Sequence, residues 1–172
     1  MSLLLATGTV RHIGVCNFSP SQFEALVKST AGLVVPYVHQ LETHAYLNQS
    51  DFVAEHAKHG VHVTAYSPFG NMNPTYASVE FPLLLESPTV AKIAAKRDCT
   101  PAQVVLKWNL DRNVAVIPKS AHTDRMAENF AATECELQDE DRADLANLPV
   151  KRFNNPSKNW GVHLFEGLQD SE

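Results

Sequence analysis

Residues 117–129 combine the side chains that bind a phosphate-bearing ligand. The stretch runs from the end of an apolar, strand-like run into the start of a helical pattern, and backbone N–H groups at a helix N-terminus attract anions. Lys119 and Arg125 bring two positive charges to the same place, and Glu128 and Asn129 follow where they could hydrogen-bond a base. The residues therefore predict a phosphate-plus-adenine site, although an ordinary solvated helix start with surface charges fits the same composition.

A second group of polar side chains closes successive apolar runs. Asn17, Gln40 and the pair Tyr66 and Ser67 each stand where a predicted strand ends. In a parallel barrel the carboxyl ends of the strands form one mouth, where active sites lie. Taken singly, each residue fits a turn or a cap equally well. Together they predict a site at one end of a sheet, alongside Lys119.

The elements that would position these residues alternate between strand-like and helical patterns. Four apolar runs are expected to form strands: residues 10–18, 33–41, 61–66 and 114–117. Helical patterns follow: residues 19–30, 50–59, two helices opening at 87–88 and 100–101, then 123–132 and 139–148, with a long loop from 70 to 87. This alternation predicts a parallel sheet with right-handed crossovers. Four strands fit either an open doubly wound sheet or part of a (β/α)8 barrel, which needs about 250 residues when whole.

Helix boundaries are marked by ordinary capping residues. Ser19 followed by proline and by Gln22 has the pattern of a capping box. Ser87 and Thr100 also precede prolines, and Gly60 is placed to end the helix at 50–59.

Composition narrows the class of protein. The 172 residues are 44% hydrophobic and 19% charged with a net charge of -5, which indicates one globular domain rather than a nucleic-acid binder. No apolar stretch is long enough to span a bilayer. Three cysteines, widely spaced and without a CxxC pair, suggest neither a disulfide framework nor a zinc site, so a reducing, cytoplasmic location is expected. Neither a GxGxxG nor a GxxxxGK[ST] motif is present.

Four motifs in order resemble the aldo-keto reductase family. Residues 10–19 resemble its R-x-I-G-V-S-N-F segment, 40–44 its Q-x-E-x-H, 66–70 its Y-S-P-L-G, and 117–129 its I-P-K-S-x4-R-x2-E-N. The intervening lengths are natural for the family, and the resemblance covers about residues 3–165. Cys16 departs from the family's usual Ser, and because a thiol is the weaker hydrogen-bond donor, one contact to the cofactor's carboxamide is affected.

The resemblance implies an α/β fold: a TIM-type parallel (β/α) barrel of which only the last four βα units are present, a half barrel. In a single partial domain of residues 1–172, residues 1–9 would end a helix, 10–149 would hold the four units and the C-terminal helices, and 150–172 would form a tail. The implied activity is NADP(H)-dependent reduction of aldehydes or ketones to alcohols.

The resemblance also implies ten cofactor-binding residues, divided by the part of NADP(H) that each would contact. They are Asn17, Gln40 and Tyr66 for the nicotinamide, Ser67 and Phe69 for the pyrophosphate, Lys119, Ser120 and Arg125 for the 2′-phosphate, and Glu128 and Asn129 for the adenine. No metal ligand is implied.

The catalytic tetrad of the family belongs to its first four strands, which the resemblance does not find here, so no catalytic residue is assigned and the chain alone is expected to be inactive. His44 is interpreted as structural. The small-molecule carbonyl substrate would need the missing half, and the exposed sheet edges of a half barrel favour an oligomer or a partner. A non-catalytic NADP-binding or regulatory module and an inactive remnant are the alternatives.

Overall fold

The computed structural model describes residues 1–29, 34–72 and 81–170 and contains one sheet of four parallel strands. The strands are β1 (Gly14–Cys16), β2 (Val38–Glu42), β3 (His62–Tyr66) and β4 (Val114–Val116). Their order in the sheet, β1-β2-β3-β4, follows the chain without reversal. A doubly wound sheet reverses its strand order at a switch point, whereas a (β/α)8 barrel does not. The predicted α/β half barrel is therefore confirmed.

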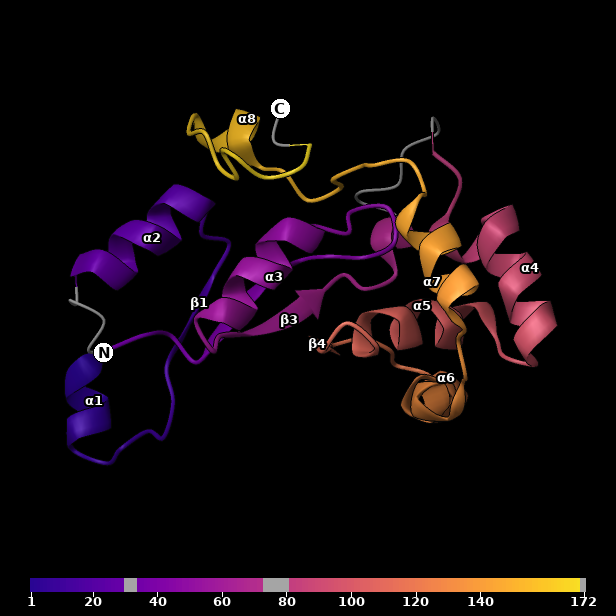
Figure 1. Cartoon of the computed structure of the whole chain (residues 1–172), viewed down its shortest axis with the longest axis horizontal. Helices are drawn as coiled ribbons and strands as arrows, with labels where there is room; N and C mark the ends of the chain where they lie inside the picture. Colours follow the sequence, from indigo (N-terminus) through magenta and orange to yellow (C-terminus); the bar gives the residue numbers. More distant parts are fainter. Residues whose placement is uncertain (30–33, 73–80, 171–172) are drawn as a thin grey trace.

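Helices connect the strands and cover the sheet (Figure 1). They are α1 (Ser2–Ala6), α2 (Pro20–Ser29), α3 (Ser50–Lys58), α4 (Pro88–Arg97), α5 (Pro101–Leu110), α6 (Thr123–Phe130), α7 (Asp139–Ala146) and α8 (Ser157–Trp160), with the 3-10 turns η1 (Gly70–Met72), η2 (Leu84–Glu86) and η3 (Ala131–Glu134). Figure 1 shows α1 and α2 at one end of the molecule and α4 to α7 at the other, with the sheet between them.

The first strand is shorter than its apolar run. Only residues 14–16 of the expected 10–18 form a strand paired with β2, and β1 lies at an edge of the sheet with a partner on one side. The start of the second run at Leu33, the end of the first helix at Thr30 and residues 73–80 of the long loop lie outside the described residues.

Three of the four predicted helix boundaries have the expected geometry. The side chain of Gln22 accepts from the Ser19 N–H at 2.9 Å while Ser19 Oγ accepts from the Gln22 N–H at 3.3 Å. Thr100 forms the same capping box with Gln103, and Gly60 ends α3 at φ +67°. Ser87 is the exception, because it precedes α4 without a side-chain capping bond.

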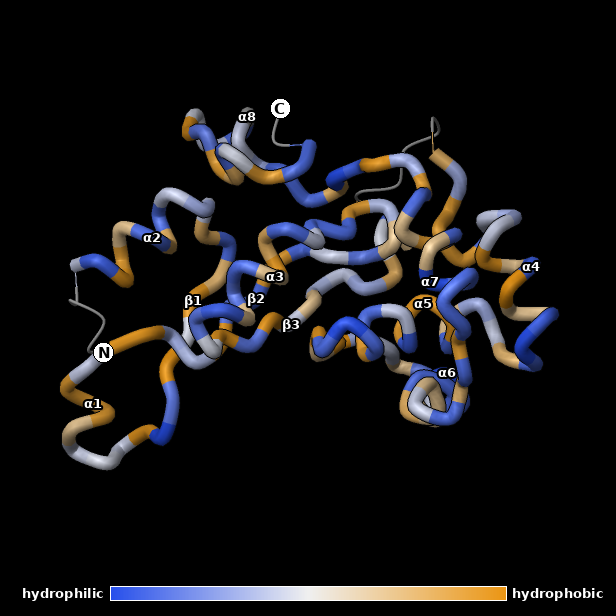
Figure 2. Tube along the Cα trace, in the orientation of Figure 1, coloured by the Kyte–Doolittle hydropathy of each residue, from blue (hydrophilic) through white to orange (hydrophobic). Residues whose placement is uncertain are grey.

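Two apolar clusters hold the elements together. The larger packs α4, α5 and α7 around the buried Trp108 and Leu145, and the smaller packs Phe52 of α3 onto Val63 and Val114 of the sheet. Figure 2 shows hydrophobic segments of α5 and the strands in the interior, while much of α6 and α7 is hydrophilic. Helix α6 lies against α5 and η3 and has no buried residue of its own.

The expectation for the cysteines was wrong. Cys99 and Cys135 form a disulfide with their Cα atoms 5.9 Å apart, although 36 positions separate them in sequence. Cys16 is free and exposed. Spacing along a chain does not reveal a pair that only folding brings together.

Within residues 1–29, 34–72 and 81–170, no helix has the length and apolar character that crossing a membrane requires.

Candidate functional site

A cleft of about 800 Å³ opens between the turn after β3 and the segment that joins β4 to α6. Seven of the ten predicted cofactor-binding residues line it: Ser67, Phe69, Lys119, Ser120, Arg125, Glu128 and Asn129. The two sides meet because the Ile117 N–H donates to the Ala65 carbonyl at 3.2 Å, which continues the β3–β4 pairing beyond β4. The cleft therefore lies at the carboxyl end of the sheet, as predicted.

One wall of the cleft is cationic. Lys119 and Arg125 are both exposed, and neither forms an ion pair with any residue that the structure describes. Between them, Ser120 Oγ accepts from the His122 N–H at 3.1 Å, which shapes the turn into α6. Two unneutralised cations, a hydroxyl and a helix N-terminus on one wall attract an anion.

The facing wall is the turn that follows β3. Ser67 has a left-handed backbone with φ 47°, and its carbonyl accepts from the Gly70 N–H at 2.8 Å. This conformation is uncommon for a non-glycine residue and persists where the surroundings enforce it. It presents Ser67 and Phe69 to the cleft.

The other three predicted residues lie at strand ends and do not line the cleft. The Asn17 N–H donates to the Gln40 carbonyl at 3.0 Å, and Tyr66 stands opposite Glu42 in the β2–β3 register. Asn17 has φ 55°, and its Oδ1 is buried without a hydrogen-bond partner among the residues described. A buried acceptor without a donor is costly, so this oxygen suits a ligand that carries an N–H group.

A buried pair of histidines supports this strand end. The Phe18 N–H donates to His39 Nε2 at 3.1 Å, so His39 Nδ1 carries the proton and donates to His56 Nε2 at 2.7 Å. His56 Nδ1 in turn donates to the Phe52 carbonyl at 2.7 Å. Burial and the neighbouring His56 lower the pKa of His39 from 6.5 to about 3, and burial lowers the pKa of His56 as well. Both rings are neutral, and they fix the loop that holds Asn17.

A buried carboxylate at the end of β2 anchors the C-terminal tail. Glu42 accepts from the N–H groups of Phe153 and Asn154 at 2.9 and 3.0 Å and from His44 Nε2 at 3.0 Å. Burial favours a higher pKa for Glu42, but the bond from His44, the backbone donors and the nearby Arg152 hold the pKa below its usual value. His44 is fully buried and bonded to Glu42, as the structural interpretation requires.

Sequence reasoning missed part of the cleft and the histidine pair. Pro101 and Ala102 at the start of α5 also line the cleft, as does Leu85. The Thr-Pro helix start was the available signal for α5, but its place beside α6 is a matter of packing. Of the tail aromatics, Trp160 is exposed, and Phe165 is buried under the Arg152 guanidinium, 4.2 Å from its ring centroid.

No group of three or more His, Cys, Asp or Glu side chains in the described part of the chain could hold a metal ion.

The chain is similar to known proteins in sequence and in fold. The sequence model of the aldo/keto reductase family matches residues 1–148. An uncharacterized oxidoreductase of Schizosaccharomyces pombe is 40% identical over 99% of this chain and 52% of its own length. An NAD(P)H-dependent D-xylose reductase of Hypocrea jecorina is 37% identical over 95% of this chain and 51% of its own.

A crystal structure of an aldo-keto reductase complexed with NADPH superimposes with a TM-score of 0.84 at 34% identity, covering 94% of this chain and 49% of that one. The chain thus spans about half the length of the relatives that it matches.

Proposed function

The chain belongs to the aldo/keto reductase family, and from this membership we propose that its 172 residues supply the NADP(H)-binding part of a reductase that converts aldehydes or ketones to alcohols. The proposal has two parts, a cofactor site within the chain and a reaction that the chain completes only with further groups.

The observation that carries the cofactor assignment is the cationic wall of the cleft. Lys119 and Arg125 flank Ser120 and make no ion pair with other described side chains. A 2′-phosphate between them accepts charge-assisted hydrogen bonds from both cations and from the hydroxyl. Glu128 and Asn129 stand next to it along α6, where their side chains contact the adenine. This wall favours NADP(H) over NAD(H), because NAD(H) lacks the phosphate.

The remaining contacts follow the cofactor toward the strand ends. Ser67 and Phe69 bind along the pyrophosphate from the opposite wall. Asn17 Oδ1, buried without a donor among the described residues, accepts from the amide of the carboxamide, with Gln40 beside it and Tyr66 against the ring. Held by these residues, the reduced nicotinamide would supply the hydride for reduction of a carbonyl group.

The chain's own residues bind and orient the cofactor, and none of the described residues is proposed as the proton donor. His44 and Glu42 are fully buried and bonded to each other, and Glu42 is also bonded to the tail, so we assign both a structural role. A non-catalytic NADP-binding module differs only in lacking the proton donor, so binding and turnover must be measured separately.

The test is a fluorescence titration of the chain with NADPH and NADH, with variants at the wall. NADPH is expected to bind tighter than NADH, and Lys119→Ala to weaken NADPH binding about ten-fold or more while leaving NADH unchanged. Lys92→Ala is the matched control, because Lys92 is exposed on α4 away from the cleft. Equal affinity for both nucleotides, or equal effects of the two substitutions, would remove the 2′-phosphate assignment.

Turnover is followed separately as loss of NADPH absorbance with an aldehyde. The chain alone is expected to bind NADPH without consuming it. Consumption that Lys119→Ala abolishes would place the proton donor within these 172 residues instead.

A further inference from the structure

The Cys99–Cys135 disulfide closes a loop that contains one whole wall of the cleft. Cys99 directly precedes Thr100, the N-cap of α5, and Cys135 directly follows η3, which continues α6. Within the 36-residue separation lie α5, β4 and the segment 117–129. Every cofactor residue proposed for the 2′-phosphate and adenine is therefore inside the closed loop, and Asn17, Gln40, Tyr66, Ser67 and Phe69 are outside it.

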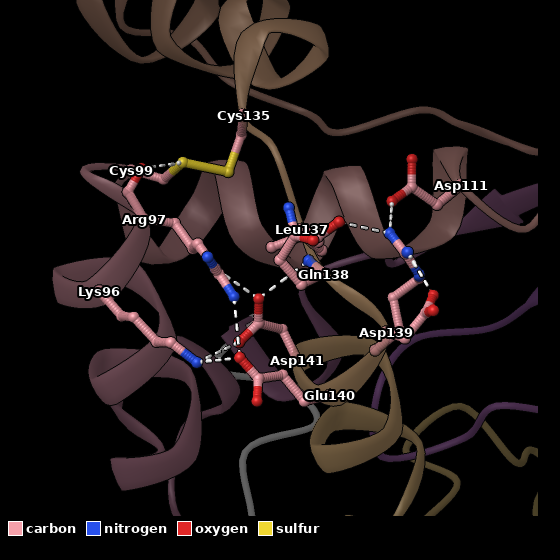
Figure 3. A network of polar contacts seen from close by, with 11 residues as sticks. Lys96, Arg97, Cys99, Asp111, Cys135, Leu137, Gln138, Asp139, Glu140 and Asp141 are labelled. Carbon is pink, nitrogen blue, oxygen red and sulfur yellow. Dashed lines mark hydrogen bonds and ion pairs between the residues drawn. A yellow bond between two sulfur atoms is a disulfide. The ribbon is translucent and has the colours of Figure 1, made fainter.

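Few polar bonds join the two ends of this loop, which also pack together through buried apolar side chains of the larger cluster. The Gln103 side chain donates to the Glu128 carbonyl at 3.4 Å, a long hydrogen bond between α5 and α6. No ion pair in the described structure links residues 99–103 to 123–135. The salt bridges drawn in Figure 3 run from α4 and from Asp111 to α7 and its start instead. The disulfide is the one covalent tie between the start of α5 and the end of α6 among described residues.

We propose that this disulfide is a redox switch that sets the affinity of the cleft for NADP(H); the inference rests on the proposed function. With the disulfide formed, the wall that carries Lys119 and Arg125 is held against the start of α5, whose Pro101 and Ala102 share the cleft. With the disulfide reduced, the loop gains conformations that the bound nucleotide must remove, so binding weakens. Asn17, Gln40 and Tyr66, which are proposed to bind the nicotinamide, lie outside the loop, so reduction of the disulfide does not change their positions directly.

The switching reaction is thiol–disulfide exchange with a small thiol. Its thiolate attacks the sulfur of Cys99, which is half-buried, rather than that of Cys135, which is buried. The bond between the two cysteines breaks, Cys135 leaves as a thiolate and takes a proton, and a mixed disulfide forms on Cys99. A second thiol displaces Cys99, so two cysteine thiols and one disulfide of the reductant result. The freed Cys99 thiol has an acceptor in place, the Arg97 carbonyl oxygen 3.3 Å away.

The experiment compares one preparation of the chain in its oxidised state, after reduction with dithiothreitol, and after reoxidation by thiol–disulfide exchange with glutathione disulfide, which is itself reduced to two thiols. Alkylation under denaturing conditions counts the thiols in each sample by mass. NADPH and adenosine 2′,5′-bisphosphate are then titrated, the second because it reaches only the side of the cleft inside the loop. Cys135→Ser mimics the reduced state. Cys16→Ser is the matched control for the response to reductant, because Cys16 is free, exposed and outside the loop. A thermal melt of every sample confirms that it is folded.

Reduction is expected to weaken binding of both nucleotides about five-fold or more, reversibly, and to weaken it by the same factor in Cys16→Ser as in the parent chain. Cys135→Ser is expected to bind weakly whether or not reductant is present. Three free thiols before reduction, or equal affinities in verified oxidised and reduced samples, overturn the switch and leave the proposed function standing. Absence of NADPH binding in both states removes the proposed function, and the switch with it.

Discussion

Mild acid is expected to destabilise this protein through the buried pair His39 and His56. Each ring has one N–H that donates and one lone pair that accepts, in a chain from the Phe18 N–H to the Phe52 carbonyl. A proton added to His39 Nε2 would point at the Phe18 N–H, and a proton added to His56 Nε2 would point at the His39 N–H. In both cases two donors would face each other, so protonation is unfavourable in the folded state. Both pKa values are therefore lowered by folding.

The sign and size of the effect follow from this shift. In the unfolded chain a histidine binds a proton below pH 6.5, whereas folded His39 stays neutral down to about pH 3. The unfolded state thus binds more protons in that window, and stability falls as the pH falls through 6.5. Between about pH 7.5 and pH 5, His39 alone lowers the free energy of unfolding by about 2 kcal/mol. His56 acts in the same direction.

The assay is urea denaturation at a series of pH values. The window between pH 6.5 and 5 separates the histidines from Glu42, whose pKa lies below 4.5. His39→Gln is expected to lower stability at pH 7 but to flatten its fall toward pH 5, whereas His163→Gln, on the exposed tail, keeps the parent slope. Parallel slopes for His39→Gln and the parent chain would refute the reasoning.

Two further substitutions test the anchors of the fold. Glu42→Gln removes the negative charge near the buried Arg152, so it is expected to destabilise the chain by roughly 3 kcal/mol. It is also expected to speed amide hydrogen exchange in residues 150–170, which Glu42 holds. Unchanged exchange in that segment would contradict the role of Glu42 as the anchor of the tail. Gly14→Ala places a Cβ 2.7 Å from the Val38 carbonyl oxygen. The free energy of unfolding, measured by urea denaturation, is therefore expected to fall by about 1–3 kcal/mol. An unchanged free energy of unfolding would show that β1 can shift to make room.

Local patterns in the sequence were sufficient for most elements and for half of the candidate site. Apolar runs and cap-then-proline starts predicted the four strands and the helices after them, because these depend on neighbours within a few residues. Lys119, Ser120, Arg125, Glu128 and Asn129 share one strand end and one helix, so their proximity could be predicted as well.

Contacts between distant segments were decided only by the tertiary structure. Cys99 and Cys135 are 36 positions apart in the sequence, so their spacing gave no sign of a pair. The packing of α5 against η3 brings their Cα atoms to 5.9 Å from each other. Likewise, His39 lies in a strand and His56 in a helix, and in the sequence each is only a residue on the apolar face of its element. In the folded chain both rings are buried away from water, and each becomes a hydrogen-bond partner of the other. Sequence periodicity reports which face of an element is buried, whereas the identity of the group across from it depends on how the elements pack.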